Sequence, residues 1–287
     1  MRLKRDNMAG ASAGFTLAEM AMVILIVGLL LGSVLTTVSS QLDARNLRDM
    51  QTQMDQIKDA LIGYAQANGR LPCPASGTVA SGTTGAGLEQ YTSPNCTSTN
   101  NFGVLPWATL GVAETDVWGR RLGYKVSTVF VDAISQGTWT RLVMSGQAAQ
   151  SPACVPVPTP TLATFALCSY GDMRVTTRTS SNKTGTNVDN LPVVIISYGK
   201  NGYGAYTPAG TQITAPPAAN ADETANATTI AGSGSTAWIA YSREISPQTS
   251  TCSDTAASTP FCEFDDVIAY IPSNILVTRA VSAGKLP

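Results

Sequence analysis

Histidine is absent from the 287 residues of the sequence. Without an imidazole, the chain cannot form a Ser-His-Asp or Cys-His catalytic group, and it cannot bind a metal ion through histidine. Carboxylates and lysines remain as catalytic groups, but no spacing of these residues indicates a reaction. We therefore expect that the protein is not an enzyme.

Charge is also scarce, since only 13% of the residues are charged. Three basic residues and one aspartate lie in the first fourteen positions, which leaves 15 basic and 18 acidic residues in the rest of the chain. A protein that neutralises phosphate groups needs a basic face, so nucleic acid is not an expected partner. The thin basic cluster of Arg174, Arg178 and Lys183 is interpreted as a solvated strand face, with contact to DNA as the alternative.

The six cysteines do not have the Cys-x-x-Cys spacing of zinc sites, and all of them lie beyond residue 70. An even set of this kind indicates disulfides formed in an oxidising compartment. Short loops close most readily, so we expect the pairs Cys73–Cys96, Cys154–Cys168 and Cys252–Cys262. Six reduced and buried thiols are the alternative.

Proline is missing between Phe15 and Leu71, and Glu19 is the one charged residue between Phe15 and Val38. Roughly 24 apolar residues, at about 1.5 Å per residue, are enough to cross a hydrocarbon core of about 30 Å. The run is too long for the apolar region of a secretory signal peptide, although cleavage after Ser40 is an alternative. The sequence therefore predicts a transmembrane helix over residues 15–38, with the basic N-terminus in the cytoplasm.

The string GFTLAE at positions 14–19 opens this apolar run. It resembles the class III leader of type IV pilins and type II secretion pseudopilins. The resemblance implies that a prepilin peptidase cleaves after Gly14 and methylates the new N-terminus at Phe15. It also implies that Glu19 pairs with the N-terminal amine of a neighbouring subunit during filament assembly. The simpler alternative is a glutamate favoured at the N-terminus of a helix by the helix dipole.

Two further features of the apolar run concern its packing. Gly28 and Gly32 form a Gly-x-x-x-Gly pair, a spacing that lets two helices approach closely, and chance glycines are the alternative. Many major subunits of the resembled family carry a proline near the twenty-second mature residue, where the helix loosens in the filament. Its absence here favours a minor pilin or a minor pseudopilin.

The apolar pattern continues beyond the run with alternating spacings of three and four, which predicts one face of a helix. Asn68 and Gly69 can end that helix with a left-handed cap, and Pro72 forbids its continuation. One helix from about Phe15 to Asn68 is therefore expected, with its later part packed on a sheet. The residues of the apolar face are Leu47, Met50, Met54, Ile57, Leu61 and Tyr64.

After Pro74, short apolar runs alternate with stretches rich in threonine, serine and glycine, which predicts an antiparallel sheet with irregular connections. Two segments rich in small residues, Ser76–Gly87 and Thr207–Ser235, are expected to be mobile loops. The expected strands are Gly123–Phe130, Trp139–Met144, Phe165–Tyr170, Val193–Tyr198, Ala237–Ser242 and Asp266–Ile271.

Four strings and the C-terminal stretch also resemble a large group of pilin-like proteins from Gram-negative bacteria. The strings are RLPCP at 70–74, GVLPW at 103–107, DVWGR at 116–120 and SYGKNG at 197–202, and the stretch is Phe261–Pro287. Trp107 and Trp118 within them are interpreted as core and turn packing, with a ligand platform as the alternative.

The expected fold is α+β, the lollipop architecture of the resembled family: a long N-terminal helix whose first half crosses the membrane, packed on an antiparallel sheet. The expected divisions are a leader at 1–14, a transmembrane half-helix at 15–38, a periplasmic half-helix at 39–69 and a β-rich domain at 70–287. The resemblance places the protein in the inner membrane with a periplasmic domain, and in a filament after assembly.

The expected function is a subunit, most simply a minor one, of a type IV pilus or a type II secretion pseudopilus. Its partners would be the prepilin peptidase, other pilins or pseudopilins, and the inner membrane. The alternative is a binding module at the filament tip, either an adhesin or a DNA-uptake pilin. No cofactor is expected, and no EF-hand spacing is present. Calcium bound by Asp222, Glu223, Asp265 and Asp266 is kept as an alternative.

Overall fold

The computed structural model describes residues 14, 16–92, 95–97, 101–131, 165, 169, 171–217, 219–227, 238–247, 249 and 251–286. The chain divides into two compact units, Met1–Arg48 and Asp49–Pro287. Helix α1 (Leu17–Asn68) begins in the first unit and ends in the second. Because its later turns belong to the second unit, they are described together with the sheets of that unit.

The prediction that the first half of α1 crosses a membrane is wrong for the described part of the chain, in which no helix is both long enough and apolar enough to do so. The apolar side chains that are described at the start of α1 run from Leu17 to Leu30. They cover about 21 Å at 1.5 Å per residue, less than a hydrocarbon core of about 30 Å. The described residues therefore do not support the expected transmembrane helix over residues 15–38, and they do not support the expected inner-membrane location.

The C-terminal end of α1 lies where the sequence predicts it. Gly69 has a left-handed backbone with φ of 69° and donates its N–H to the carbonyl oxygen of Ala65 over 2.8 Å. Glycine adopts this conformation without the steric cost that other residues have. The chain then turns toward Cys73 and the first strands.

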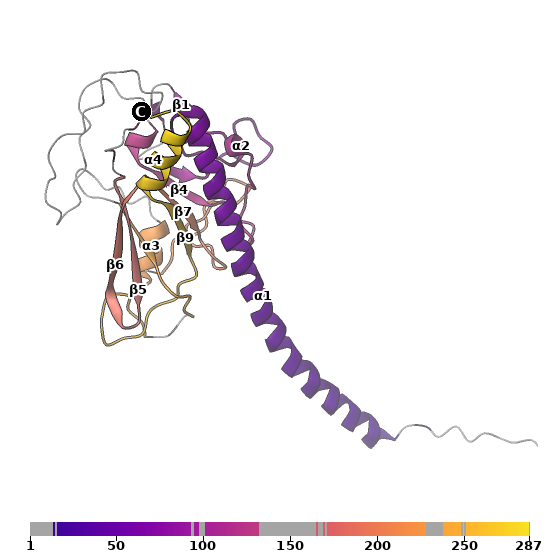
Figure 1. The fold of residues 1–287 in the computed structure, drawn as a ribbon. Coiled ribbons are helices and arrows are strands. Elements are labelled where there is room, and N and C mark those ends of the chain that lie inside the picture. Colours follow the sequence, from indigo (N-terminus) through magenta and orange to yellow (C-terminus); the bar gives the residue numbers. More distant parts are fainter. Residues whose placement is uncertain are drawn as a thin grey trace, which may run out of the picture. The chain divides into compact units, whose positions relative to one another are not determined.

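A four-stranded antiparallel sheet forms the centre of the second unit, in the order β3-β4-β7-β9. Three of these strands, β4, β7 and β9, are labelled in Figure 1. Every residue of β7 is buried. A continuous apolar strand of this kind is typical of a sheet that is covered on both faces. The strands are β3 (Phe102–Val104), β4 (Gly123–Val126), β7 (Val193–Ser197) and β9 (Val267–Ile271).

A three-stranded sheet with the order β6-β5-β8 lies in the same unit. β5 (Met173–Thr179) and β6 (Asn182–Leu191) form an antiparallel hairpin, whereas β5 and β8 (Trp238–Ser242) run parallel. The prediction of purely antiparallel pairing is therefore wrong for β8. Two short strands, β1 (Tyr91–Thr92) and β2 (Asn95–Cys96), form a further antiparallel pair.

Alternate residues of β7 belong to two different hydrophobic cores. Val193 and Ile195 lie in a core with the buried face of α1, whereas Val194 and Ile196 lie in a core with β5, β6 and β8. This division follows from the period of two along a strand, which points successive side chains to opposite faces. Helix α4 (Ser273–Ser282) adds Leu276 to the first of these cores.

The face of α1 that packs on the sheet is the one that the spacing predicts. Met50, Met54, Ile57 and Leu61 are each at most 3% exposed and contribute to the core that includes Val193 and Ile195. A buried aliphatic side chain of this kind typically stabilises a fold by about 2–5 kcal/mol relative to alanine. The later part of α1 thus packs on the central sheet of the same chain.

The expected strands agree only in part with the observed ones. Those expected at 193–198, 237–242 and 266–271 match β7, β8 and β9 within one residue at each end, and the one at 123–130 ends at Val126 and continues as a 3₁₀ turn, Thr128–Phe130. Trp139–Met144 lies outside the described residues, as does most of Phe165–Tyr170. Strands β5 and β6 and the short helices α2 (Trp107–Leu110) and α3 (Ala221–Ala227) were not predicted.

Arg121, whose side chain is fully buried, bonds described residues of both segments that were expected to be mobile loops. Residues 218 and 228–235 of the second segment lie outside the described part of the chain. Nη1 of Arg121 donates to the carbonyl oxygens of Gly77 and Val79, each over 2.8 Å, and its Nη2 donates to that of Pro208 over 3.1 Å. Its guanidinium also pairs with Glu114 over 2.8 Å. Arg121 thereby supplies hydrogen bonds to loop carbonyls that have no strand partner.

The turn after α1 is organised around Glu89. Arg70 makes two parallel hydrogen bonds to this carboxylate, of 2.7 and 2.8 Å, and Tyr64 donates its hydroxyl to it over 2.6 Å. The N–H of Cys73 adds a bond of 2.9 Å, and the Arg70 guanidinium lies 3.8 Å above the ring of Tyr91. Bidentate pairing of this kind fixes the geometry as well as the charge, which explains Arg70 and Cys73 in the RLPCP string.

These contacts predict a pH dependence of stability. Burial raises the pKa of Glu89, but the hydrogen bonds from Arg70, Tyr64 and Cys73 outweigh it, so the pKa lies below its ordinary value. The stabilisation is therefore complete above about pH 4.3, the pKa of an unfolded glutamate, and is lost as the pH falls through the folded value.

Thermal unfolding of the wild type and of Glu89→Gln between about pH 3 and pH 6 measures this effect, because glutamine cannot titrate. We expect the difference in Tm between the two proteins to be largest at the upper end of this range and to shrink below about pH 4.3. A difference that does not change with pH would contradict the assignment.

Candidate functional site

The start of α1 is closed by reciprocal hydrogen bonds between Thr16 and Glu19. The amide N–H and the hydroxyl of Thr16 each donate to Oε2 of Glu19 over 2.8 Å, and the N–H of Glu19 donates to Oγ1 of Thr16 over 3.3 Å. These bonds form a capping box, which satisfies N–H groups that have no partner within the helix. The hydrogen bonds from the backbone and side chain of Thr16 lower the pKa of Glu19, so the carboxylate is ionised at neutral pH.

Glu19 therefore has a local role at the helix N-terminus, as the simpler alternative from the sequence supposed. The Thr-x-x-Glu pattern that signals a capping box was present in the sequence and was missed. Gly14 is exposed and lies outside the helix, which begins at Leu17. The expected methylation site, Phe15, lies outside the described residues.

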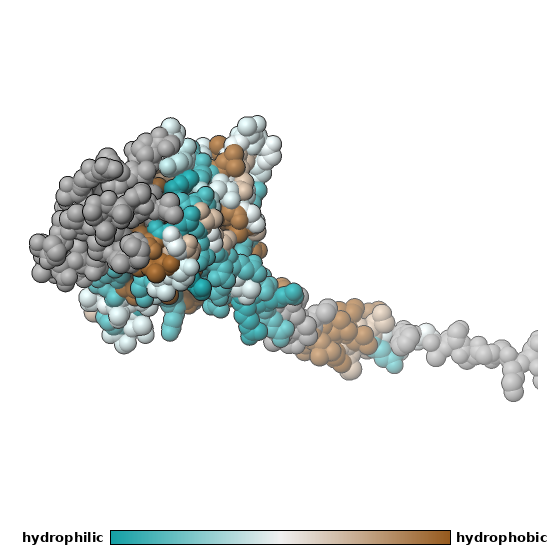
Figure 2. Space-filling view, turned by 45° about the horizontal axis from the view of Figure 1, so that its top comes forward, coloured by the Kyte–Doolittle hydropathy of each residue, from teal (hydrophilic) through white to brown (hydrophobic). Residues whose placement is uncertain are grey.

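The first turns of α1 expose apolar side chains in every direction. Each large apolar residue from Leu17 to Leu30 is at least 47% exposed, and Leu17 reaches 91%. Six of them, Met22–Val27, are consecutive and therefore occupy all sides of a helix with 3.6 residues per turn. In Figure 2 this stretch is mostly brown, which marks apolar residues. A helix that is apolar all round requires cover on all sides.

Gly28 lies within this apolar stretch, and a Cβ atom added to it would meet nothing within 4 Å. The surface at Gly28 is therefore open to a second helix, which is the arrangement that a Gly-x-x-x-Gly pair favours. Gly32 also lies in α1, but outside the residues whose side chains are described.

Two disulfides are present among the described residues, and they join the neighbours that the argument from short loops predicts. Cys73 and Cys96 have Cα atoms 5.5 Å apart, and Cys252 and Cys262 have Cα atoms 4.8 Å apart. The first ties the end of α1 to β2, and the second closes a loop before β9. Cys154 and Cys168 lie outside the described residues, so their pairing stays a prediction.

Three of the four acidic residues proposed from the sequence as calcium ligands lie together. One carboxylate oxygen from each of Glu223, Asp265 and Asp266 lies within 4.8 Å of the others. Glu223 is in the first turn of α3, and the two aspartates directly precede β9. Asp265 Oδ2 accepts a bond of 2.8 Å from the N–H of Asn201, which lies in the turn after β7.

Burial and mutual repulsion dominate the electrostatics of these carboxylates. Burial is the largest cause in each case: it raises the pKa of Glu223, raises that of Asp265 to about 7 and raises that of Asp266 well above its ordinary value. The repulsion between neighbouring carboxylates acts in the same direction, while hydrogen bonds from Asn201 and Asn226 oppose it. Such a group favours a compensating positive charge.

Asp222, the fourth proposed ligand, belongs to a different network. Its side chain is fully buried and forms ion pairs with Arg178 and, over 3.1 Å, with Arg243. Arg243 also pairs with Asp254 over 3.0 Å. These pairs join α3 to β5 and to the loop of the second disulfide, so Asp222 stabilises the fold and does not face the carboxylate group.

The thin basic cluster is engaged within the protein. Arg174 pairs with Asp189, and Arg178 pairs with Asp222. The ammonium of Lys183 donates to three carbonyl oxygens of the second disulfide loop, those of Ser253, Ala256 and Thr259, over 2.6–2.8 Å. These contacts favour a structural interpretation of the cluster over contact with DNA.

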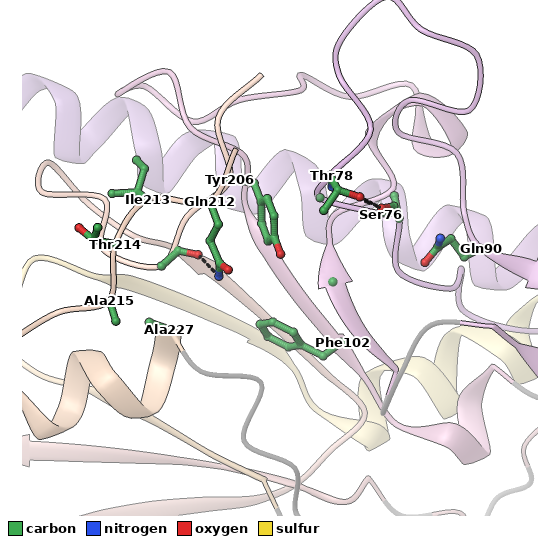
Figure 3. A pocket seen from close by; sticks show the side chains of 14 residues that line it. Ser76, Thr78, Gln90, Phe102, Tyr206, Gln212, Ile213, Thr214, Ala215 and Ala227 are labelled. Carbon is green, nitrogen blue, oxygen red and sulfur yellow. Dashed lines mark hydrogen bonds between the residues drawn. The ribbon is translucent and has the colours of Figure 1, made fainter. Parts of the chain in front are cut away.

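A pocket of about 670 Å³ opens between the loop at residues 75–78 and the segment at residues 204–215, which follows β7. Figure 3 shows its lining, in which Tyr206 and Phe102 supply aromatic rings and Gln212 an amide that is bonded to the Gly204 carbonyl over 3.0 Å. None of the residues that are described as lining this pocket is charged. The pocket thus offers no group that would neutralise a phosphate, as a DNA-uptake pilin requires.

With this geometry in place, the chain can be compared with known proteins. No family model, no curated protein and no solved structure matches it. The roles of its residues are therefore argued from their contacts, burial and charge.

Two residues that organise the second unit, Arg121 and Asn220, were not predicted from the sequence. Arg121 bonds carbonyls in two loops, and Asn220 is fully buried with its amide 3.2 Å from Glu223. The DVWGR string ends one position before Arg121, but nothing in the string indicates that this arginine is buried. Asn220 lies in a stretch of alanine and threonine that reads as a loop.

Proposed function

We propose that the protein is a filament subunit of the type IV pilin and pseudopilin class, and a minor one. The observation that carries the proposal is the GFTLAE string at the start of a helix that exposes apolar side chains on all sides. Each element alone is ambiguous, since the string is short and exposed apolar helices occur in other settings. In this order they provide a processing site and a surface that must be covered.

Neighbouring subunits provide the cover. Helices packed side by side bury the residues from Leu17 to Leu30, and burial of apolar surface stabilises such a bundle by about 25 cal/mol per Å². A helix that is apolar on one side alone would need a single partner, whereas this one accommodates several. Gly28 allows one of them to approach closely.

Cleavage after Gly14 would give this bundle its internal charge pair. The new amine on Phe15 is positive, and the Glu19 carboxylate of an adjacent subunit is its counterpart. Between packed apolar side chains, water is excluded, so the attraction is stronger than on an exposed surface. The pair would fix the axial position of one subunit against the next, which apolar contacts alone do not do.

The second unit supports a minor rather than a major subunit. It holds three sheets, two disulfides and three α-helices besides the end of α1 within the described residues. A domain of this size is difficult to repeat at every position of a uniform fibre. The absence of proline between Phe15 and Leu71 agrees with this interpretation.

Mass spectrometry of the mature N-terminus tests the proposal. In cells that contain a prepilin peptidase, we expect a chain that begins at Phe15 and carries one N-methyl group. Gly14→Val is expected to keep the leader, and Gly10→Val, a matched change within the leader, is expected to be processed normally. A wild-type chain that begins at Met1 or at Gln41 would contradict the proposal.

A further inference from the structure

The pocket between residues 75–78 and 204–215 has no part in the proposed filament contacts. Its volume of about 670 Å³ lies within the range of about 300–1,000 Å³ that is typical of small-molecule sites. The residues described as lining it combine aromatic rings with amides and hydroxyl groups, and none of them is charged. The rings belong to Phe102 and Tyr206, the amides to Gln90 and Gln212, and two of the hydroxyls to Ser76 and Thr78.

Several polar groups of this lining are available to a ligand. The hydroxyl of Tyr206 and the side-chain amide of Gln90 make no hydrogen bond within the described part of the chain. Gln212 donates from Nε2 to the Gly204 carbonyl over 3.0 Å, which fixes the amide and leaves its oxygen as an acceptor. Figure 3 shows the Tyr206 hydroxyl and the Gln212 amide directed toward the same part of the pocket. The pocket therefore offers hydrogen-bond donors and acceptors without charge.

The side chains that shape the pocket are held in place before any ligand binds. A Cβ atom on Gly77 would lie 2.5 Å from the ring of Tyr206, so the ring packs against backbone at a distance that only glycine allows. Arg121 donates to the Gly77 carbonyl over 2.8 Å and fixes the same loop. The ring of Phe102 packs beside that of the buried Trp238, with the ring centres 6.3 Å apart. A site that is already ordered loses less entropy on binding.

We propose that this pocket binds an uncharged oligosaccharide. Sugar hydroxyls both donate and accept hydrogen bonds, as amides and hydroxyl groups require of a partner. The C–H groups on the face of a sugar ring carry a small positive charge and pack on the negative face of an aromatic ring. A ligand with a phosphate or carboxylate group would find no counter-charge among the described lining residues, and a purely apolar ligand would leave their polar groups without partners.

An extended peptide fits this place less well, because such a peptide binds by adding a strand to a free sheet edge. The edge strand beside the pocket is β3, and it already has a partner at Val104. The N–H of Ala75 donates to the Val104 carbonyl over 2.9 Å, and the N–H of Val104 donates to the Ala75 carbonyl over 3.0 Å. The backbone of β3 is therefore occupied at this point, and side chains are left to recognise the ligand.

Calorimetric titration of the full chain with neutral trisaccharides tests the proposal, and it does so independently of filament assembly. The probes are maltotriose, cellotriose and the trimer of N-acetylglucosamine. We expect at least one of them to bind with a Kd of about 1 mM or below. Sialyllactose, an acidic trisaccharide, should bind at least about tenfold more weakly, because its carboxylate has no counter-charge in the pocket.

Two results of these titrations would overturn the proposal. One is the absence of binding by all three neutral probes at about 10 mM. The other is binding of sialyllactose, or of an uncharged tripeptide with blocked ends, that is as tight as that of the best neutral probe or tighter.

Three variants and two controls locate the site with the neutral trisaccharide that binds best. Tyr206→Phe and Gln90→Leu each remove a polar group without a partner in the described chain, so they should keep the fold and weaken binding about three- to tenfold. Thr214→Trp should weaken it at least about tenfold by filling the pocket. Gln56→Leu on α1 and Thr278→Trp on α4, the matched changes at exposed positions, should bind normally. Unchanged binding by all three pocket variants would overturn this placement.

Discussion

A chain carrying Glu19→Ala is expected to be cleaved and to keep its folded second unit, yet to be lost from filaments. The second unit begins at Asp49, so the change leaves its sheets and disulfides untouched. In the filament, the change leaves the N-terminal amine of a neighbour without its carboxylate. We expect recovery in sheared filaments to fall by about tenfold or more, the scale of one lost charge-assisted hydrogen bond.

The capping box makes this experiment sharper, because Glu19 also bonds Thr16 within its own chain. Glu19→Gln keeps an oxygen that can accept from Thr16 but removes the charge, and Thr16→Val removes the hydroxyl but keeps the charge. If the charge acts between subunits, Glu19→Gln fails like Glu19→Ala, and Thr16→Val assembles. Normal assembly of Glu19→Gln together with failure of Thr16→Val would show that the residue serves only the helix end.

Replacing Arg121 by methionine is expected to destabilise the second unit by about 3–5 kcal/mol, the range for one lost partner of a buried ion pair. The substitution leaves Glu114 without its counter-ion and the carbonyls of Gly77 and Val79 without their arginine donor. The carbonyl of Pro208 loses one donor and keeps those of Ser81. Methionine retains much of the volume, so the loss measures the polar contacts rather than a cavity.

Urea unfolding of the full chain, followed by tryptophan fluorescence, measures this loss. The guanidinium carbon of Arg121 lies 4.6 Å from the centre of the Trp107 ring. The fluorescence of Trp107 therefore reports on the surroundings of Arg121. Arg121→Lys should recover little of the stability lost in Arg121→Met, because one ammonium group cannot replace the five N–H donors of a planar guanidinium. Arg279→Met, on an exposed position of α4, should change the stability by less than about 0.5 kcal/mol. Equal losses at both arginines would contradict the assigned role.

The elements predicted correctly from the sequence are those whose signal is local. The end of α1 follows from Asn68, Gly69 and Pro72, and its buried face follows from the spacing of Met50 to Leu61. Strand β7 was evident as a short apolar run followed by a glycine turn. The two disulfides follow from short loops. In each case a few neighbouring residues contain the physical cause.

The hairpin of β5 and β6 was missed because its sequence lacks the apolar alternation of a strand. β6 contains asparagine, aspartate and glycine, which are depleted in strands. Its stability comes from pairing with β5 and from cross-strand bonds such as that of Thr176 to Asn187, 2.8 Å. Such partners are visible only when both strands are in place.

The carboxylate group was predicted only in part, for a similar reason. Asp265 and Asp266 are adjacent in the sequence, but Glu223 and Asn220 reach them only because α3 packs near the start of β9. Asp222, next to Glu223, points to a different partner because neighbouring helical residues face different directions. Sequence proximity therefore suggested four ligands, of which one belongs to another network.

The order of strands in the central sheet has a consequence for how the chain is made. Ser197 of β7 pairs with Val267 of β9, seventy positions later, and α4, which completes the core, comes later still. At synthesis rates of about 5–20 residues per second, β7 waits about 4–14 s for this partner. During that time, the most apolar strand of the sheet has an open edge, the kind of surface that recruits other chains. A ribosome that stops before residue 267 therefore releases a fragment prone to aggregate, and the last twenty residues act as the closing step of folding.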